Sequence, residues 1–363
     1  MANTYGVTGF PGYLATELLK ELFRQGYPVD HIYLIHEASM KEKAAAQLKK
    51  MDDWIDSEKV TLVQGDITEP QLGIAPKTFV EMQKTVTHFW HLAALYDLAV
   101  SLPASWRVNV HGTRKVNEAL GSFSNLKRYL YFSTAYVSGK REGTIKEQEL
   151  GHQEGFKNHY EYTKYEAEVL VEQRKADLPV TIIRPGIVVG HSKTGETAKF
   201  DGPYSILNAL HQFASLPVLP YIGAGTAKVN LVPQDYVIQA SIYLTHHDKG
   251  IGQTYHLTDP SPYQARDIYN MFADYLLTKT PRGTVPIAVA RQALQVSSVR
   301  KWLGIQKQAL DYFLCESEYD ASNATLDLKG AGIYCPDFAD YYPVLIDYYE
   351  AHRHERDKHV SIL

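Results

Sequence analysis

Apolar positions in the first 190 residues alternate between two spacings. Residues 13–25 place leucines at helical intervals, whereas residues 31–35 form a short apolar run typical of a buried strand. The same alternation predicts further strands at 59–66, 86–94, 128–134 and 180–185, and further helices at 44–55, 106–120 and 160–175. Strands that alternate with helices indicate crossover connections and a parallel sheet. We therefore predict an α/β fold, a doubly wound parallel (Rossmann) sheet with helices on both faces.

The pattern changes after Gly190. Residues 191–203 are polar, rich in Gly, Thr and Lys, and long enough for a functional loop. Beyond them the pattern predicts helices at 204–216 and 235–247, strands at 228–233 and 253–259, and then mostly helices, interrupted by Pro281, Pro286 and Pro336. We predict a smaller, mostly helical C-terminal substrate lobe. The expected division is a dinucleotide-binding domain at 1–190, to which 234–258 returns, and a substrate-binding lobe at 191–233 and 259–363.

Composition and charge exclude several classes of protein. The 363 residues are 45% hydrophobic and 21% charged, as in ordinary globular chains. The net charge of −4 argues against nucleic acid as a partner. Cys315 and Cys335 form no CxxC motif, so neither a disulfide framework nor a cysteine metal site is expected, and no metal is predicted.

The expected compartment is the cytoplasm. Two free thiols suit a reducing environment. The N-terminus lacks the apolar region of a signal peptide. No stretch reaches the ~18 apolar residues of a membrane span. We expect a small-molecule enzyme that is a monomer or a homodimer, with no membrane span.

A glycine-rich turn lies near the N-terminus. Gly6, Gly9 and Gly12 are three residues apart in GVTGFPG, directly before a helical pattern. Glycines permit a tight turn, close approach of a pyrophosphate to the backbone, and packing of the helix on its strand. The helix start adds free N–H groups and a positive dipole end. The alternative is a purely structural turn, and the preceding strand, expected at about residues 2–5, is short and polar for a central strand.

The end of the second strand bears on the choice of cofactor. NAD enzymes of this type place an acid near this point to bind the ribose 2′-OH, and NADP enzymes place a basic residue there. Ile35 and His36 offer no early acid, although Glu37 follows and Lys41 is near. We therefore favour NADP(H) over NAD(H). Asp66, after the third strand, is a candidate for the adenine amino group, or else a turn cap.

Tyr160 and Lys164 are four residues apart on a predicted helix, so their side chains share a face. A tyrosine with a pKa of ~10 is a poor proton donor near neutrality, and a neighbouring lysine stabilises its phenolate. Thr134 ends the preceding strand and could hold a substrate oxygen at the same sheet edge. Tyr162 is not expected to take this role, because the residue four positions on is Glu166.

These features together resemble the extended short-chain dehydrogenase/reductase superfamily over residues 3–260. The motifs are, in order, GVTGFPG, GDIT, HLAA, NVHGT, FSTAYVSG, YEYTK and RPGIVVG. Within it, the chain resembles the thioester reductase and fatty acyl-CoA reductase (male sterility, NAD-binding) branch. That finer resemblance rests on FSTAYVSG, RPGIVVGHSKTGETAKFDGPY, NLVPQDYV and YHLTDP. The branch often has an arginine where His36 stands.

The resemblance implies a role for each matching residue. Tyr160 is the acid/base, Lys164 tunes it and contacts the nicotinamide ribose, and Thr134 binds the reacting oxygen, with Ser133 as second choice. Asn109 braces the active-site backbone. The implied cofactor-binding residues are Gly6, Gly9, Phe10, Pro11, Gly12, His36, Asp66, Ile67, Ala93, Asn109, Ser133, Tyr160, Lys164, Pro185 and Gly186.

The predicted function is NAD(P)-dependent hydride transfer to a carbonyl, that of an acyl thioester or an aldehyde. The substrate would be an acyl-CoA or a carrier-protein-bound acyl group. A sugar-nucleotide epimerase or reductase, or a hydroxysteroid-type dehydrogenase, is the alternative enzyme. A non-catalytic NADP-binding regulator is the alternative outside catalysis. We also predict that residues 191–203 and parts of 261–363 form a lid over the nicotinamide end of the cleft.

Overall fold

A computed structural model describes residues 2–96, 100–306 and 309–360. Its centre is a seven-stranded sheet in the order β11-β7-β5-β4-β1-β2-β3, in which every neighbouring pair is parallel. The strands are β1 (Asn3–Thr8), β2 (Val29–His36), β3 (Val60–Gln64), β4 (His88–His91), β5 (Arg128–Phe132), β7 (Val180–Pro185) and β11 (Thr254–Leu257). The chain builds outward from β1 to β3 and then returns to the other side of β1 at β4. This order confirms the doubly wound sheet, and it opens a crevice beyond the carboxyl ends of β1 and β4.

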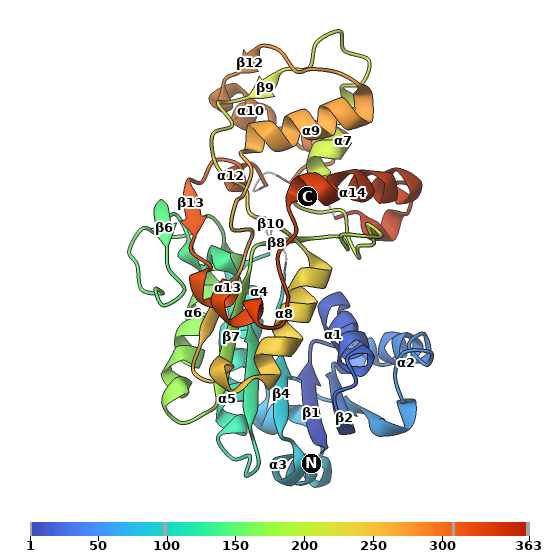
Figure 1. Cartoon of the computed structure of the whole chain (residues 1–363), viewed down its shortest axis with the longest axis vertical. Coiled ribbons are helices and arrows are strands. Elements are labelled where there is room, and N and C mark those ends of the chain that lie inside the picture. Colours follow the sequence, from blue (N-terminus) through green and yellow to red (C-terminus); the bar gives the residue numbers. More distant parts are fainter. Residues whose placement is uncertain (1, 97–99, 307–308, 361–363) are drawn as a thin grey trace.

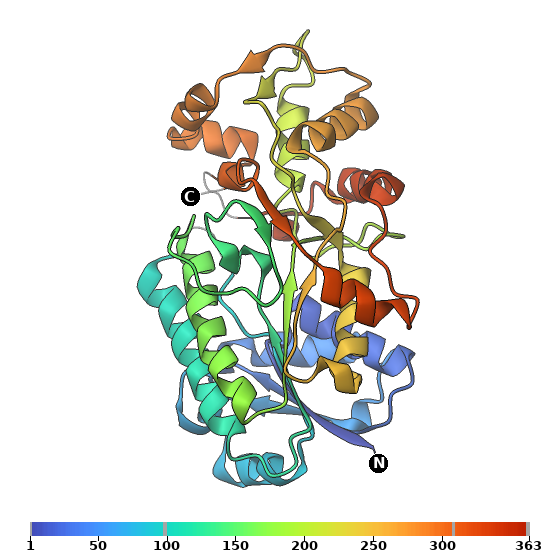
Figure 2. The ribbon, with the colours of Figure 1, turned by 60° about the vertical axis from the view of Figure 1, so that its left-hand side comes forward.

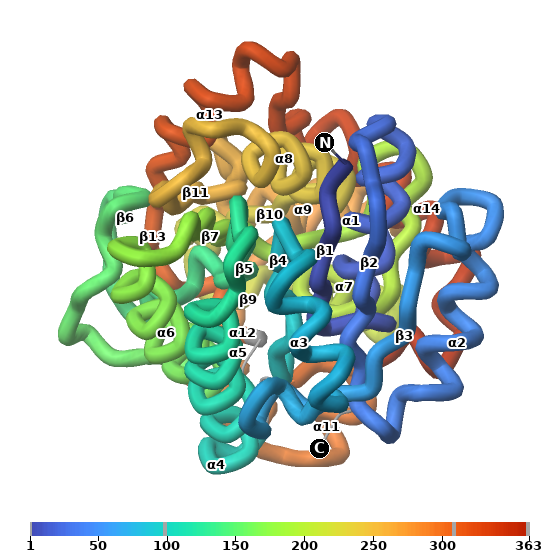
Figure 3. The backbone as a smooth tube through the Cα atoms, turned by 90° about the horizontal axis from the view of Figure 1, so that it is seen from below, coloured from blue at the N-terminus to red at the C-terminus, as the bar shows by residue number. Residues whose placement is uncertain are grey.

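Helices cover both faces of the sheet (Figure 3). One buried apolar cluster joins α1, α2, α8 and α13 to the sheet, and a second joins α3, α5 and α6 to it. Their bounds are α1 (Tyr13–Arg24), α2 (Lys41–Lys49), α3 (Pro76–Thr85), α5 (Thr113–Leu120), α6 (His159–Glu172), α8 (Gln234–His246) and α13 (Ser322–Lys329). The helix expected at 44–55 begins and ends earlier than predicted. The helix expected at 106–120 begins with α4 (Leu102–Ser105) and reaches α5 through a π-helical stretch, Trp106–Gly112.

The first strand is longer than its sequence predicts. β1 continues to Thr8, so Gly6 lies inside the strand and not in the turn. A Cβ at Gly6 would lie 2.7 Å from the ring of Phe89 on β4, which explains the need for glycine there. Tyr5 and Val7 are fully buried, so the strand is apolar where it crosses the core. The expectation of a short strand at residues 2–5 was wrong because the turn begins only after Thr8.

A helical lobe lies beyond the carboxyl ends of the strands, at the end of the molecule opposite the N-terminus (Figures 1 and 2). Its apolar cluster joins α7 (Tyr204–Gln212), α9 (Ala265–Leu277) and α14 (Phe338–His352). Shorter elements complete it: β9 (Tyr221–Ile222), β12 (Thr284–Val285), α10 (Ile287–Ala293), α11 (Ser297–Leu303) and α12 (Ala309–Tyr312). The mostly helical C-terminal part is confirmed.

Short strand pairs connect this lobe to the sheet. β10 (Leu231–Pro233) pairs with β8 (Ile187–Val189) and not with the main sheet, and it is shorter than the strand expected at 228–233. β13 (Ser317–Tyr319) pairs with β6 (Gly143–Ile145). β11 is an edge strand of the main sheet, and α8 packs on that sheet. α13, from the late part of the chain, packs on it too. The proposed domain boundaries stay a prediction. Within the described residues, no helix combines the length and the apolar character needed to cross a bilayer.

Candidate active site

The glycine turn joins β1 to α1 and packs against the end of β4. Gly9 has φ +91°, and a Cβ there would lie 2.8 Å from the backbone nitrogen of Ala93. Gly12 N donates to Gly9 O (2.7 Å), and a Cβ at Gly12 would lie 2.5 Å from that same oxygen. The first turn of α1, from Tyr13, carries no acidic side chain and no side-chain cap. The start of α1 therefore has a positive dipole end with no acid and no capping side chain, and the glycines leave the neighbouring backbone uncovered. These features fit the pyrophosphate of a dinucleotide.

Gly12→Ala is expected to weaken cofactor binding by at least about tenfold, a loss of ~1.4 kcal/mol. The added methyl group meets backbone and not a flexible side chain, so the turn itself must shift. Fluorescence titration with NADPH and NADH measures the effect. Gly151→Ala is the matched control, since a Cβ at Gly151 meets nothing within 4 Å. Equal affinities for Gly12→Ala and wild type would show that the turn does not hold the cofactor.

The other proposed cofactor residues line the carboxyl edge of the sheet near this turn. Phe10 is buried in the core and Pro11 is half-buried. Ile67 is buried and packs against Gly112, where a Cβ would lie 2.7 Å from its Cδ1. Asp66 Oδ1 accepts hydrogen bonds from the backbone and hydroxyl of Thr68, both at 2.8 Å. Asp66 therefore caps a turn in this structure, which is the alternative role that its sequence left open.

The end of β2 presents His36 from the sheet and Glu37 from the loop. The His36 ring is buried, and its Nδ1 lies 2.9 Å from Glu37 O. Glu37, Lys41 and Lys43 are exposed. The structure thus brings one histidine, one acid and two lysines to the region where a ribose 2′ substituent would lie.

Thr134 and Tyr160 lie on two elements that contact each other, the turn after β5 and α6. Thr134 begins a 3-10 turn, Ala135–Ser138, and its Oγ1 accepts from the backbone N–H of Tyr136 at 3.3 Å. Its hydroxyl proton therefore stays available for donation. Tyr160 lies in the first turn of α6, with its ring edge-on to Tyr96 at a centroid distance of 5.0 Å. Burial, with a further contribution from the charge of Glu161, raises the pKa of Tyr160 above its usual value.

Lys164 is buried one turn further along α6. Its Nζ donates to Phe132 O at 2.6 Å and to Tyr131 Oη at 2.9 Å, both on β5. Burial lowers the pKa of Lys164 to about 7, and the carboxylate of Glu168 opposes that shift. The predicted catalytic residues are thus gathered at one strand end, and the ammonium of Lys164 is held by the strand.

Ser133 has different surroundings from Thr134. Its hydroxyl donates to Glu168, which is buried and paired with Arg184 at 2.5 Å. Arg184 directly precedes Pro185 and Gly186, the segment proposed to lie over the nicotinamide. The geometry therefore supports Thr134 as the first choice for the substrate oxygen and gives Ser133 a structural partner.

Two further predicted residues join neighbouring backbones. Asn109, in the π-helical stretch, bonds to both N (2.8 Å) and O (3.3 Å) of Leu95 and to Thr163 Oγ1 (3.0 Å). It therefore braces the loop after β4 against α6. Gly186 N donates to Leu257 O, and a Cβ at Gly186 would lie 2.7 Å from Asn230 Oδ1. Only a residue without a side chain fits between β7 and β8.

The loop 191–203 packs between α14 and the start of α1. Tyr13 Oη donates to Glu196 O at 3.2 Å, next to the glycine turn. A Cβ at Gly195 would collide with Val344 O in α14. Lys358 Nζ donates to Thr197 O at 2.9 Å. This placement beside the proposed cofactor turn is compatible with a lid, and the lid stays a prediction.

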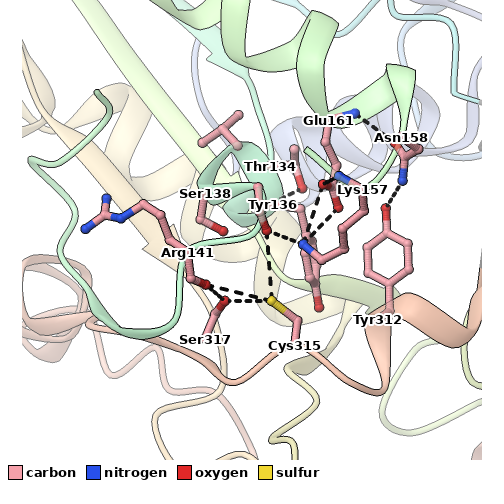
Figure 4. A network of polar contacts seen from close by, with 12 residues as sticks. Thr134, Tyr136, Ser138, Arg141, Lys157, Asn158, Glu161, Tyr312, Cys315 and Ser317 are labelled. Carbon is pink, nitrogen blue, oxygen red and sulfur yellow. Dashed lines mark hydrogen bonds and ion pairs between the residues drawn. The ribbon is translucent and has the colours of Figure 1, made fainter. Parts of the chain in front are cut away.

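A buried charged pair beside Thr134 was not anticipated from the sequence. Lys157 lies just before α6 and Glu161 lies in its first turn. The ammonium of Lys157 lies against the rings of Tyr136 and Tyr312 (Figure 4). In the sequence both read as ordinary solvated charges. The available signal was their spacing of four residues across a helix start, with Asn158 placed as an N-cap.

Comparison with known proteins gives the family. The family model described as "Male sterility protein", an NAD-binding model, matches residues 7–241. The chain belongs to this family. Membership confirms the extended short-chain dehydrogenase/reductase resemblance and its thioester reductase and fatty acyl-CoA reductase branch, and it makes the cofactor a nicotinamide dinucleotide.

Similar proteins include a fatty acyl-CoA reductase and a peptide synthetase. The chain is 25% identical over 270 residues to the Drosophila melanogaster fatty acyl-CoA reductase wat, in a match that covers 64% of the chain and 52% of that protein. It is 25% identical over 278 residues to the nonribosomal peptide synthetase asaC of Aspergillus flavus, in a match that covers 72% of the chain and 26% of the synthetase. The chain therefore spans about half of the first protein and about a quarter of the second.

A solved structure matches almost the whole chain. The terminal R domain from the myxalamid PKS-NRPS biosynthetic pathway superposes with a TM-score of 0.81 at 26% identity. The match covers 98% of this chain and 92% of that one, so it includes the helical lobe as well as the sheet.

Proposed function

We propose that this protein is an NAD(P)-dependent reductase that transfers hydride to the carbonyl of an acyl thioester or an aldehyde. The observation that carries the proposal is the placement of Thr134, Tyr160 and Lys164 around the end of β5. The glycine turn after β1 lies at the same edge, since carboxyl ends of parallel strands share one edge of a sheet. The likeness to a fatty acyl-CoA reductase, together with the R-domain likeness over 98% of the chain, supports a thioester as the substrate.

The side chains act on the carbonyl oxygen. Bound NAD(P)H supplies the hydride. As negative charge develops on the oxygen, the hydroxyls of Thr134 and Tyr160 donate hydrogen bonds to it, and each such donor is worth ~3 kcal/mol in the transition state. Tyr160 then transfers its proton to that oxygen. The phenol is protonated near neutrality, so its proton is there to give, although burial and Glu161 raise its pKa and oppose the tuning expected from Lys164.

The product depends on the carbonyl compound. A thioester first gives a hemithioacetal, in which the carbon–sulfur bond breaks to release a thiol and an aldehyde. An aldehyde gives the alcohol directly. The acyl donor is proposed to be an acyl-CoA or a carrier-protein-bound acyl group, in keeping with a fatty acyl-CoA reductase and a peptide synthetase among the relatives.

NADP(H) is the proposed cofactor in preference to NAD(H). The end of β2 has no acid at Ile35 or His36, and exposed Lys41 and Lys43 lie nearby for a 2′-phosphate. The proposed compartment is the cytoplasm, which suits the free thiols of Cys315 and Cys335. A monomer or a homodimer stays the prediction for the oligomeric state.

Oxidation of NADPH and NADH against a substrate panel tests these proposals. The panel holds acyl-CoA thioesters, aldehydes, ketones and UDP-sugars. We expect turnover with acyl-CoA or aldehyde, and tighter binding of NADPH than of NADH in fluorescence titrations. Turnover confined to UDP-sugars or to hydroxysteroid ketones would favour the alternative dehydrogenases. Cofactor binding without any turnover would favour a regulator. Equal or tighter binding of NADH would indicate that Glu37 binds the ribose 2′-OH, as an acid does in NAD enzymes.

A further inference from the structure

Lys157 and Glu161 form an ion pair that is almost entirely removed from water. Their side chains are 5% and 0% exposed, and Lys157 Nζ lies 3.3 Å from Glu161 Oε1. The backbone N–H of Lys157 also donates to Glu161 Oε2 at 3.0 Å. Two charges are rarely buried this deeply unless they satisfy each other and a further polar group. The proposed hydride-transfer steps make no use of either residue.

The further polar group belongs to the turn that carries Thr134. Lys157 Nζ donates to Gly139 O (Figure 4). Gly139 closes the turn that Thr134 begins, with its N–H on Tyr136 O at 3.0 Å. One ammonium group therefore ties the Thr134 turn to the first turn of α6, where Tyr160 lies.

The same two segments are held together by neutral contacts as well. Gly139 has φ +61°, and a Cβ there would collide with Gly155 O. Lys140 N donates to Gly155 O at 2.9 Å, and His152 Nε2 lies 2.9 Å from Val137 O. These contacts fix the approach of the segment that leads into α6. Arg141 also pairs with Glu149 at 2.6 Å, and the Lys157–Glu161 ion pair adds a charged contact where α6 begins.

Aromatic rings shield the ion pair. Lys157 Nζ lies 5.5 Å from the ring centroid of Tyr136 and 5.7 Å from that of Tyr312, and the two rings meet edge to face at 4.9 Å. Asn158 donates from Nδ2 to Tyr312 Oη at 3.0 Å and accepts the N–H of Glu161 at Oδ1. Electrostatic interactions strengthen where water is excluded, so the pair can hold the two segments firmly.

We propose that Lys157 and Glu161 are positioning residues, which clamp the Thr134 turn to the start of α6 and so set the separation of the Thr134 and Tyr160 hydroxyls. The inference rests on the proposed function, because it concerns the oxygen that these two hydroxyls would bind. Misplacement of a reacting group by ~1 Å can lower a rate by ~10²-fold, so a clamp at this position has large leverage on catalysis.

The clamp also has an electrostatic consequence. The carboxylate of Glu161 raises the pKa of Tyr160, in addition to the larger effect of burial. Lys157 offsets part of that negative charge. The groups that face Glu161 come from several elements: Lys157, Tyr136 of the turn, Tyr312 of α12, Tyr319 of β13 and Tyr160 itself. Those near Tyr160 are Tyr96, Tyr131, Glu161 and Lys164. Removing the charge of Glu161 is therefore expected to lower the pH at which Tyr160 ionises.

Three variants test the clamp: Lys157→Met, Lys157→Arg and Glu161→Gln. Hydrogen exchange of residues 134–141 reports on the turn and needs no substrate. We expect faster exchange there in Lys157→Met, and protection close to wild type in Lys157→Arg. In turnover, we expect kcat to fall roughly 10- to 100-fold in Lys157→Met with a smaller change in KM. Glu161→Gln, which removes the charge that holds Lys157, should speed exchange at 134–141 and lower kcat in the same way. Lys115→Met, on an exposed pair with Glu118, is the control.

The outcomes separate the two hypotheses. Unchanged exchange at 134–141 in Lys157→Met overturns the clamp, whatever the enzyme does. Faster exchange with unchanged kcat in Lys157→Met and Glu161→Gln overturns the catalytic role. If Lys157→Met does not fold, Glu161→Gln decides the same questions, and Lys157→Arg shows whether a positive charge at this position restores the protection. Absence of turnover in the wild type overturns the proposed function, and hydrogen exchange still decides whether the clamp exists.

Discussion

Tyr160→Phe is expected to remove nearly all turnover while cofactor affinity stays close to that of the wild type. The substitution deletes only the phenolic hydroxyl, and the ring can keep its edge-on contact with Tyr96. General acids typically contribute ~10²- to 10⁴-fold to a rate, and we expect a loss in that range. Steady-state oxidation of NADPH with the best acyl-CoA or aldehyde measures kcat, and fluorescence titration measures cofactor binding.

Tyr162→Phe is the matched control on the same helix. Its ring packs near Trp106 and Phe156, with centroid distances of 5.7 and 5.3 Å, so the phenyl ring preserves the packing. We expect a change in kcat of less than about threefold, which is under ~1 kcal/mol. A Tyr160→Phe enzyme with near wild-type kcat would remove Tyr160 from catalysis, and a comparable loss in both variants would point to disturbance of α6.

The sheet was predictable because each of its elements carries a local pattern. Buried parallel strands are continuous apolar runs, and the crossover helices are amphipathic. The strand that failed, β1, shows what such patterns miss. Gly6 reads as part of a turn, yet it lies within the strand. The position takes a glycine because the ring of Phe89 fills the space that a side chain would need. That contact joins residues far apart in the sequence, and no local spacing encodes it.

The candidate site also combines features that local spacing predicts with contacts between segments distant in the sequence. The glycine turn and the Tyr160–Lys164 spacing are local, so the sequence could place them on one strand end and one helix face. The partners of Lys164 on β5, of Ser133 at Glu168 and of Lys157 at Gly139 depend on how distant segments meet. Polar residues in these positions read as surface residues until the fold buries them.

Glu168→Ala is expected to lower the free energy of unfolding by ~3–5 kcal/mol, the usual cost of removing one partner of a buried ion pair. Glu168 is fully buried on α6, and its Oε1 accepts from Arg184 Nε at 2.8 Å and Nη2 at 2.5 Å. The remaining partners of Arg184 are the backbone oxygens of Glu147 and Glu149 and the ring of His256. None of these carries a negative charge, so the variant leaves a buried cation without an anion.

Urea denaturation measures this loss, and the exposed pair Arg174–Asp177 gives its control. Asp177→Asn breaks a 2.6 Å contact at the surface and should change the free energy of unfolding by less than ~1 kcal/mol. The double variant Glu168→Leu/Arg184→Met should recover part of the loss of Glu168→Ala, because it removes the unpaired charge together with its partner. A Glu168→Ala protein as stable as the control would mean that water reaches Arg184. In that case the Glu168–Arg184 pair would not be what holds α6 against β7. It would also not be what holds Ser133 close to the segment at Pro185 and Gly186.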